Sequence, residues 1–226
     1  MNLSRLESLV GEENINKIKN LKVLILGLGG VGGYAVESLT RCGVSNITLV
    51  DGDTIKPSNI NRQIIATRWN NNRYKTKEWK KRIKRINPNA SVNIINTHIT
   101  EDNMEVLFSD KYDYIIDCCD TSKVKIKLVK ECCKKGIKLI SSMGMANKID
   151  SSKVMISTLD KTETDPLAKK IRGALKGEEK SLMKDVTVVY SNEKPINNNN
   201  MLGSTAFVPA VAGLYITNFI ILDVIK

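Results

Sequence analysis

The chain has 226 residues, of which 42% are hydrophobic, and this is enough for one well-packed domain. Its formal net charge of +11 favours a polyanionic partner such as nucleic acid. The same excess of lysine is also found on surfaces that serve only solubility. The five cysteines are Cys42, Cys118, Cys119, Cys132 and Cys133. Their spacing excludes a disulfide framework and a structural zinc site of the CxxC type. With no secretory signal at the N-terminus, we expect a reducing, cytoplasmic location.

Short apolar runs in the first 144 residues predict strands at 21–26, 47–50, 92–95, 114–117 and 138–141. Helices are predicted from the glycine loop at 27–32 to Cys42, then at 75–86 and 122–135. Gly43 and Gly136 follow two of these helices, and Pro88 follows the third, as is typical of helix ends. Strands that alternate with helices predict an α/β fold, namely a doubly wound, mainly parallel Rossmann-like sheet with helices on both faces.

The regular alternation ends after Gly144. Strands are predicted at 154–158 and 186–190, in an antiparallel extension, and Asp165-Pro166 begins a basic helix that runs to Lys176. Asn197 to Asn200 form a polar loop. The apolar run 207–225 has the length of a membrane span, but polar residues and Pro209 interrupt it. We therefore expect a buried or dimer-interface helix and no membrane association.

The GxGGxG loop at 27–32 stands after a strand and opens a helix, where a phosphate-binding turn belongs. Glycines there permit a tight turn and a close approach to a polyphosphate, and the helix N-terminus presents free N–H groups. Asp51, at the end of the second strand, is placed to accept hydrogen bonds from ribose hydroxyls. This pattern indicates a nucleotide, but it fits NAD as well as ATP.

The segments Ser58–Gln63, Asp117–Thr121 and Arg82–Pro88, together with the glycine loop, resemble the ubiquitin-activating-enzyme-like adenylyltransferases over nearly the whole chain. The resemblance implies one domain, with a nucleotide-binding core at 1–144 and a substrate and dimerisation extension at 145–226. It implies ATP and Mg²⁺ as cofactors. It implies that Arg62 and Lys75 stabilise the charge of the phosphates and that Asp120 holds Mg²⁺, which suits attack by a carboxylate on an α-phosphate.

The full set of nucleotide-binding residues implied by the resemblance combines the glycine loop with later polar positions. Arg5 belongs to it because relatives carry an arginine there that reaches the ATP site of the partner subunit. The set is Gly27, Gly29, Gly30, Gly32, Asp51, Asp53, Ser58, Asn59, Asn61, Arg62, Gln63, Lys75, Asp120, Thr121 and Arg5.

The second half of the chain resembles one particular group of these adenylyltransferases. Residues 140–148, 165–172, 188–195 and 203–209 are similar to the tRNA threonylcarbamoyladenosine dehydratases. That implies activation of the threonine carboxylate of the modified adenosine at position 37 of tRNA, followed by ring closure from the acyl adenylate. No protein nucleophile is needed, and no cysteine follows Cys133. The resemblance also implies a homodimer and leaves room for a sulfur-relay protein partner. For the single histidine, His98, we expect a surface position rather than catalysis.

Two basic helices fit a tRNA substrate, although a solvated helix face has the same composition. Their residues are Arg73, Lys77, Lys80, Lys81, Lys84 and Arg85 in the first, and Lys169, Lys170, Arg172 and Lys176 in the second. Three alternatives remain open from the sequence. They are an enzyme that activates the C-terminal glycine of a ubiquitin-like sulfur carrier, an NAD-dependent oxidoreductase, and a tRNA-binding module without catalysis.

Overall fold

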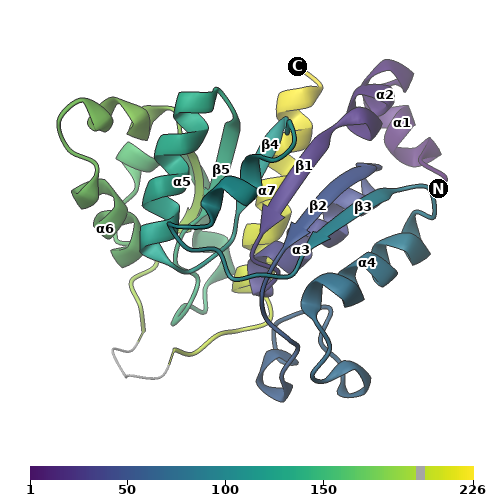
Figure 1. The fold of residues 1–226 in the computed structure, drawn as a ribbon, viewed down its shortest axis with the longest axis horizontal. Coiled ribbons are helices and arrows are strands. Elements are labelled where there is room, and N and C mark those ends of the chain that lie inside the picture. Colours follow the sequence, from purple (N-terminus) through teal and green to yellow (C-terminus); the bar gives the residue numbers. More distant parts are fainter. Residues whose placement is uncertain (197–201) are drawn as a thin grey trace.

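The computed structural model describes residues 1–196 and 202–226, so the predicted polar loop at Asn197–Asn200 lies outside the described residues. Seven strands form one sheet in the order β3-β2-β1-β4-β5-β7-β6 (Figure 1). Their bounds are β1 Lys22–Leu26, β2 Asn46–Val50, β3 Ser91–Ile95, β4 Tyr114–Asp117, β5 Lys138–Ser142, β6 Val154–Thr158 and β7 Thr187–Ser191. The predicted doubly wound, mainly parallel α/β fold is confirmed.

The central strands are mostly apolar because both faces of the sheet are covered, although β1 begins at Lys22 and β4 ends at Asp117. In β1, Val23 and Ile25 join one hydrophobic cluster, whereas Leu24 and Leu26 join the other. β4 divides in the same way, with Ile116 on the first face. This alternation explains why the strands appear in the sequence as continuous hydrophobic runs rather than as polar–apolar repeats.

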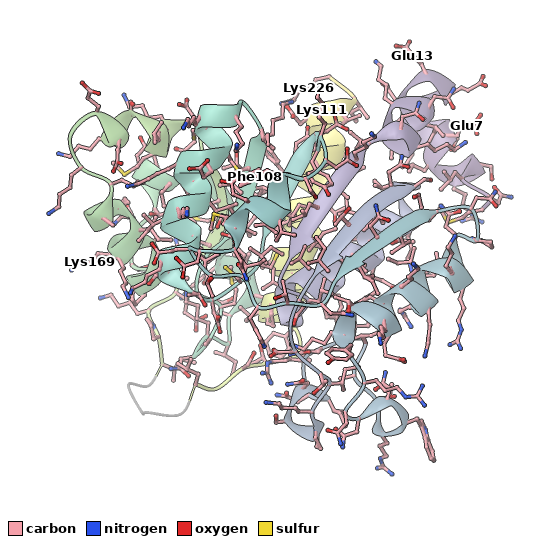
Figure 2. All side chains as sticks on the ribbon, in the orientation of Figure 1. Glu7, Glu13, Phe108, Lys111, Lys169 and Lys226 are labelled. Carbon is pink, nitrogen blue, oxygen red and sulfur yellow. The ribbon has the colours of Figure 1, made fainter. Side chains whose placement is uncertain are left out.

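Helices cover the sheet in two layers. The cluster on the first face contains side chains from α2 (Glu12–Asn20), α3 (Gly30–Arg41), α4 (Lys75–Ile86) and α7 (Val208–Val224). The cluster on the second face contains side chains from α5 (Ser122–Lys135) and α6 (Pro166–Ala174). On α6, Lys169 points away from the sheet into solvent (Figure 2). A further helix, α1 (Ser4–Val10), buries no residue.

The apolar C-terminal segment forms α7, which lies against α3. A side chain at Gly213 would place its Cβ 2.4 Å from the Val31 carbonyl oxygen, so the two helices approach too closely for any residue but glycine. The hydroxyls of Ser38 and Thr217 join the helices by a 2.6 Å hydrogen bond. One face of α7 is thus buried, as predicted, while its other face is partly exposed. Within residues 1–196 and 202–226 no helix is long and apolar enough to cross a membrane.

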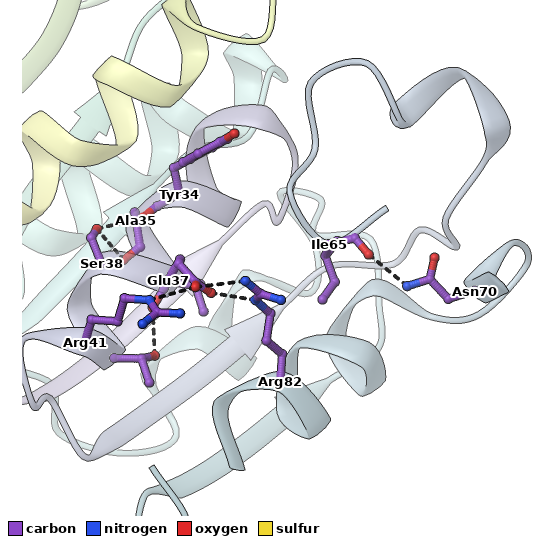
Figure 3. Close-up of polar contacts among 10 residues, drawn as sticks. Tyr34, Ala35, Glu37, Ser38, Arg41, Ile65, Asn70 and Arg82 are labelled. Atoms are coloured by element: carbon purple, nitrogen blue, oxygen red, sulfur yellow. Dashed lines mark hydrogen bonds and ion pairs between the residues drawn. The ribbon is translucent and has the colours of Figure 1, made fainter. Parts of the chain in front are cut away.

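Glu37 is the polar link between α3 and α4. Its carboxylate accepts hydrogen bonds from Arg82 Nε at 2.6 Å and Nη2 at 2.9 Å, and from Arg41 Nε at 2.8 Å (Figure 3). Burial by itself raises the pKa of Glu37, but the two guanidinium groups outweigh it, so the pKa lies below its ordinary value. Arg82, part of a motif in the sequence, therefore has a structural role.

Most predicted elements agree with the structure, and the differences are local. The helices at 75–86 and 122–135 and the strands at 114–117 and 154–158 have the expected bounds. β7 lies one residue later than predicted, and α6 ends at Ala174 instead of Lys176. The expected antiparallel extension is half right. β6 pairs antiparallel with β7, but β7 itself runs parallel to β5 and so continues the main sheet.

Candidate functional site

The glycine loop passes so close to the end of β4 that two of its positions tolerate no side chain. Gly27 has a φ of +86°, and a Cβ on it would meet the Cys118 carbonyl oxygen at 2.7 Å. A Cβ on Gly32 would lie 1.9 Å from the Gly27 carbonyl oxygen. The loop therefore folds as a tight turn that presents the first residues of α3 at the carboxyl end of the sheet.

A cleft of roughly 1000 Å³ opens at this edge, along the carboxyl ends of β1, β2, β4 and β5. β1 lies between β2 and β4. From β1 the chain first adds β2 and β3 on one side of the sheet and then adds β4 and β5 on the other, so the switch point lies at the glycine loop that follows β1. In open α/β sheets, ligands bind outside the carboxyl ends of the strands at such a switch point. The topology therefore makes this cleft the candidate site.

Asp51 is fixed in the cleft by backbone groups. Its Oδ2 accepts the Leu28 N–H at 2.7 Å, and its Oδ1 accepts the Asp53 N–H at 2.7 Å. The carboxylate thus ties the glycine loop to the segment after β2. Each oxygen keeps a second lone pair, so contact with a ribose hydroxyl is compatible with this scaffold role.

Lys75 is a buried cation beside two acids. Its Nζ lies 2.7 Å from Asp53 Oδ2 and 3.6 Å from Asp51 Oδ2, and the side chain is only 5% exposed. Burial raises the pKa of Asp53, but the hydrogen bond and charge of Lys75 more than offset this, and the pKa lies below its ordinary value. His98 Nε2 lies 3.7 Å from Asp53 Oδ1. His98 is exposed as expected, but it also lines the cleft.

The turn after β2 presents a second group of polar side chains. Asn59 Oδ1 accepts the Lys56 N–H at 3.0 Å and so caps this turn. Arg62 Nη1 donates to the Ser58 carbonyl at 2.8 Å and to Asn61 Oδ1 at 2.9 Å. Gln63 is buried, and its Oε1 has no hydrogen-bond partner among the described residues. An amide oxygen buried without a partner at the edge of a cleft suits a ligand that donates a hydrogen bond.

Asp120 and Thr121 follow β4 and lie exposed on the opposite rim. The Thr121 hydroxyl donates to Asp120 Oδ1 over 3.4 Å, which leaves the carboxylate open to a cation. Across the described ranges, no group of three or more His, Cys, Asp or Glu side chains could hold a metal by itself. This donor set suits Mg²⁺, which commonly binds one or two carboxylates together with substrate phosphates.

Twelve of the fifteen predicted nucleotide-binding residues line this one cleft. They are Gly27, Gly29, Gly30, Asp51, Asp53, Ser58, Asn59, Arg62, Gln63, Lys75, Asp120 and Thr121. Gly32 lies behind the turn, and Asn61 Nδ2 donates to the Ser204 carbonyl at 3.2 Å, which joins the turn to the segment before α7. Arg5 lies on α1 beside Arg41, outside this cleft of its own chain.

A buried ion pair that the sequence did not predict lies under the cleft floor. Lys125 Nζ lies 2.8 Å from Asp117 Oδ2, and it also donates to Ser141 Oγ at 3.1 Å and to the Ser142 carbonyl at 2.8 Å. Burial lowers the pKa of Lys125, but the charge of Asp117 outweighs it and the pKa is raised. These contacts join the ends of β4 and β5 to α5. Nothing in the local pattern around Lys125 distinguishes it from the exposed lysines nearby.

A second missed pair lies in the far half of the cleft. Lys148 Nζ donates to Asp165 Oδ2 at 3.1 Å and to the Ser191 carbonyl at 3.0 Å, and both members of the pair are buried. Asp165 Oδ1 also accepts the Ala168 N–H at 2.9 Å and so caps α6, as predicted. The pair fixes the start of α6 at the cleft. The helix-capping signal could identify Asp165, but not its partner.

The cysteines have the character of packing residues. Burial is the main cause that raises the pKa of Cys118 to about 12 and that of Cys132 to about 12, and it raises the pKa of Cys119 also. Cys118 and Cys119 line the cleft beside the glycine loop. At neutral pH their thiols are protonated and are poor nucleophiles.

Fold and site together define a doubly wound α/β protein with one cleft at the switch point of its sheet, where the glycine loop, cationic side chains and an exposed carboxylate come together. The ThiF family model matches residues 3–221, and the chain belongs to this family.

Comparison with individual proteins gives a narrower likeness. The chain is 40% identical to a tRNA threonylcarbamoyladenosine dehydratase of Bacillus subtilis, over 99% of its own length and 94% of that protein. It is 36% identical to the Escherichia coli protein of that name, over 75% of its own length and 63% of that protein. The crystal structure of E. coli tRNA N6-threonylcarbamoyladenosine dehydratase in complex with ATP superposes with a TM-score of 0.91 at 30% identity, covering 98% of this chain and 93% of that one.

Proposed function

We propose that this protein is an ATP-dependent tRNA threonylcarbamoyladenosine dehydratase. The observation that supports it most directly is one cleft, at the switch point of the sheet, that combines the glycine loop, Lys75, Arg62 and Asp120. The Bacillus subtilis relative bears this name, and the Escherichia coli protein of the same name was solved in complex with ATP. In the reaction, the threonine carboxylate of the modified adenosine attacks the α-phosphorus of ATP and pyrophosphate leaves. Intramolecular attack on the acyl carbon then closes the ring and releases AMP.

Different residues of the cleft bind different parts of the nucleotide. Backbone N–H groups at the start of α3 bind phosphate oxygens, and Asp51 accepts from the ribose. Lys75 and Arg62 offset the charge that builds up on the pentavalent phosphorus and on pyrophosphate. Asp120 provides the protein carboxylate for Mg²⁺, which supplies further charge neutralisation when it is bound.

The far half of the cleft suits the modified nucleoside. It is bounded by residues 142–148, by the start of α6 and by residues 202–204. The buried Lys148–Asp165 pair joins the first two of these segments. We assign to it a positioning role, because a nucleoside docked there would set its carboxylate toward the α-phosphate. The protonated thiols of Cys118 and Cys119 fit a reaction without a thioester.

Mass spectrometry of nucleosides tests this function. tRNA that contains threonylcarbamoyladenosine is incubated with the protein and ATP-Mg²⁺, and then digested. We expect a product lighter by one water, and AMP and pyrophosphate in equal amounts. A reaction without ATP serves as the control. Unchanged nucleosides together with intact ATP would refute the proposal.

The same experiment separates the alternatives. ATP consumption that requires a small carrier protein with a C-terminal glycine would identify a sulfur-carrier-activating enzyme. Calorimetric binding of NAD without binding of ATP would identify an oxidoreductase. tRNA binding that is unaffected by loss of Arg62, Lys75 and Asp120, with no turnover, would identify a binding module.

We further propose that the enzyme acts as a homodimer in the cytoplasm, with a sulfur-relay protein as a possible partner. Large apolar side chains on the outer face of α7 support the dimer, among them Leu214, Tyr215 and Leu222. Because Arg5 lies outside the cleft of its own chain, it is free to reach the cleft of a second copy. The proposed tRNA substrate supports the location.

A further inference from the structure

The positive charge of this protein is concentrated in one segment. From Thr54 to Ala90 the sequence contains eleven lysines and arginines but a single acid, Glu78. Glu78 is itself paired with Lys81 at 2.8 Å and Arg73 at 3.6 Å. The remainder of the chain is nearly neutral, since the whole carries +11. Lys75 and Arg82 are paired with Asp53 and Glu37, outside the segment, and the other cations make the connection between β2 and α4, and α4 itself, attractive to a polyanion.

This segment exposes a large aromatic side chain. Trp69 is 87% exposed, whereas the second tryptophan, Trp79, is completely buried under α3. Tyr74 is 41% exposed, and Lys77 Nζ lies 5.1 Å from the centre of its ring. Arg68 and Arg73 are exposed in the same connection. Exposed apolar rings between cations are typical of surfaces that bind single-stranded nucleic acid, because every base has a face that can stack.

The turn that bears Trp69 is held rigidly. Asn70 is buried, and its Nδ2 donates to the Ile65 carbonyl at 2.8 Å (Figure 3). Its Oδ1 accepts the Thr67 N–H at 2.8 Å. The Thr67 hydroxyl in turn accepts the Trp69 N–H at 3.3 Å. Trp69 is thus presented by an ordered turn, which lowers the entropy lost when a ligand binds it.

The same turn is joined to the edge of the active-site cleft. The Ile55 N–H donates to the Arg73 carbonyl at 2.9 Å, and the Asn72 N–H donates to the Ile55 carbonyl at 2.9 Å. Thr54 forms a bridge with Tyr74, and Thr54 and Lys75 both line the cleft. A nucleic acid with one base in the cleft therefore has its neighbouring nucleotides within reach of this turn.

We propose that Trp69 and Tyr74 form a stacking surface for unpaired bases of the tRNA loop next to the modified adenosine, with Arg68, Arg73 and Lys77 on its phosphates. This rests on the proposed function and adds how the substrate is recognised. A second copy of the chain is the less suitable occupant, because two surfaces with this excess of positive charge repel each other.

Tryptophan fluorescence tests the contact without relying on activity. Acrylamide reaches Trp69 but not the buried Trp79, so quenching in the free protein reports Trp69. We expect a tRNA anticodon stem-loop to lower this emission and to shield it from acrylamide, while a fully paired RNA duplex of equal length does neither. The Trp69→Phe variant should lack the emission that acrylamide quenches, which shows that this emission comes from Trp69. Full acrylamide access in the RNA complex would overturn the proposal, and so would shielding that depends on protein concentration without RNA, which would indicate a second copy.

Steady-state kinetics gives the second measurement. Trp69→Ala should raise KM for tRNA roughly 5-fold to 100-fold, the range expected for the loss of one base–aromatic stack, with kcat and ATP binding unchanged. Trp69→Tyr should retain most of the affinity, whereas Trp69→Leu should not. Lys77→Ala should also weaken binding. Its matched control is Lys135→Ala, because Lys135 lies 5.0 Å from the Phe108 ring at the end of α5, where the strands begin.

Two outcomes distinguish a failure of the stacking surface from a failure of the proposed function. If wild-type protein cyclises the nucleoside and Trp69→Ala does so with an unchanged KM, the stacking surface is wrong and the function stands. If wild-type protein leaves the nucleoside unchanged while RNA still shields Trp69, the function is wrong and the stacking surface stands.

Discussion

Lys75 Nζ lies 2.7 Å from Asp53 Oδ2 inside the candidate site, so the cation proposed to bind the phosphates is paired with an acid. Asp51 lies 3.6 Å from the same ammonium group. Removal of Lys75 would leave both carboxylates to repel ATP. The pairing holds the Lys75 side chain in place, although only 5% of it is exposed.

For Lys75→Met we expect a loss of roughly 10²-fold or more in kcat/KM for ATP, the scale of one lost electrostatic contact. Asp53→Asn should cost at least tenfold less, because it removes the counter-ion and keeps the cation. Pyrophosphate release measures both, with circular dichroism as the check on folding. Equal losses in the two variants would show that the pair, rather than the cation, is what the reaction needs.

Asp120→Ala and Arg62→Ala should each fold normally and lose roughly 10²-fold or more in turnover. Arg62 makes its described hydrogen bonds within its own turn, through Nη1 alone, so the rest of its guanidinium group can contact phosphate. Asp110→Ala is the matched control for Asp120, because Asp110 is an exposed aspartate before β4 that does not line the cleft, and it should affect turnover little. Single-turnover rates near the wild-type value in either variant would reject its assigned role.

The Glu37–Arg82 contact should stabilise the fold in a pH-dependent way. The pKa of Glu37 is depressed in the folded state, so the stabilisation is fully present above its ordinary value of 4.5 and is lost as the pH falls through the folded-state value. Glu37→Gln should therefore lower the free energy of unfolding by roughly 1–2 kcal/mol at pH 7, and by less below pH 4.5.

Urea denaturation at pH 7 and in acid measures this difference. Glu13→Gln is the control, since Glu13 pairs with Lys17 on the surface and is 83% exposed (Figure 2). Exposed pairs contribute little to stability. A destabilisation by Glu37→Gln that stayed constant through the acid range would mean that the carboxylate charge contributes nothing.

The exposed lysines of α6 should contact the tRNA backbone. Replacing Lys169 and Lys170 with Ala should weaken tRNA binding and reduce the slope of log K against log salt by about two, one for each phosphate contact. Arg172 is a poorer choice for this test, because its guanidinium also donates to the Thr162 hydroxyl and so has a structural role. ATP affinity should stay unchanged. An identical salt slope in the double variant would remove α6 from the tRNA surface.

The proposed homodimer can be tested by mass and by mixing. Light scattering should give twice the 25.2 kDa of one chain, and Leu214→Glu on the outer face of α7 should lower this mass. If Arg5 acts across the dimer, Arg5→Ala and Asp120→Ala should each be inactive alone. After subunits are exchanged, roughly a quarter of the wild-type rate should return, because half of the dimers then contain one intact site. No recovery from a mixed dimer would place Arg5 outside the partner's site.

Much of the fold could be predicted from the sequence because the signals are local. The apolar runs of β1 and β4, the ends of α4 and α5 and the Asp165 cap depend on residues a few positions apart. The glycine loop could also be predicted from a local signal, since its tight turn follows from steric limits at single positions. The N-terminal helices went unpredicted because α1 buries nothing and α2 buries only Ile15 and Ile18, so they depend on the rest of the chain for support.

The sequence by itself therefore determined the strand–helix alternation and the position of the nucleotide loop. Only the tertiary structure decided which charges meet. Lys75 finds Asp53 across 22 positions, and Lys148 finds Asp165 across 17. The cause is the path of the connections that leave the carboxyl ends of β2 and β5, which fold back on themselves. The Lys75 N–H, for example, donates to the Asp53 carbonyl at 3.1 Å. Local periodicity does not predict such contacts, because it shows only which face of an element is buried.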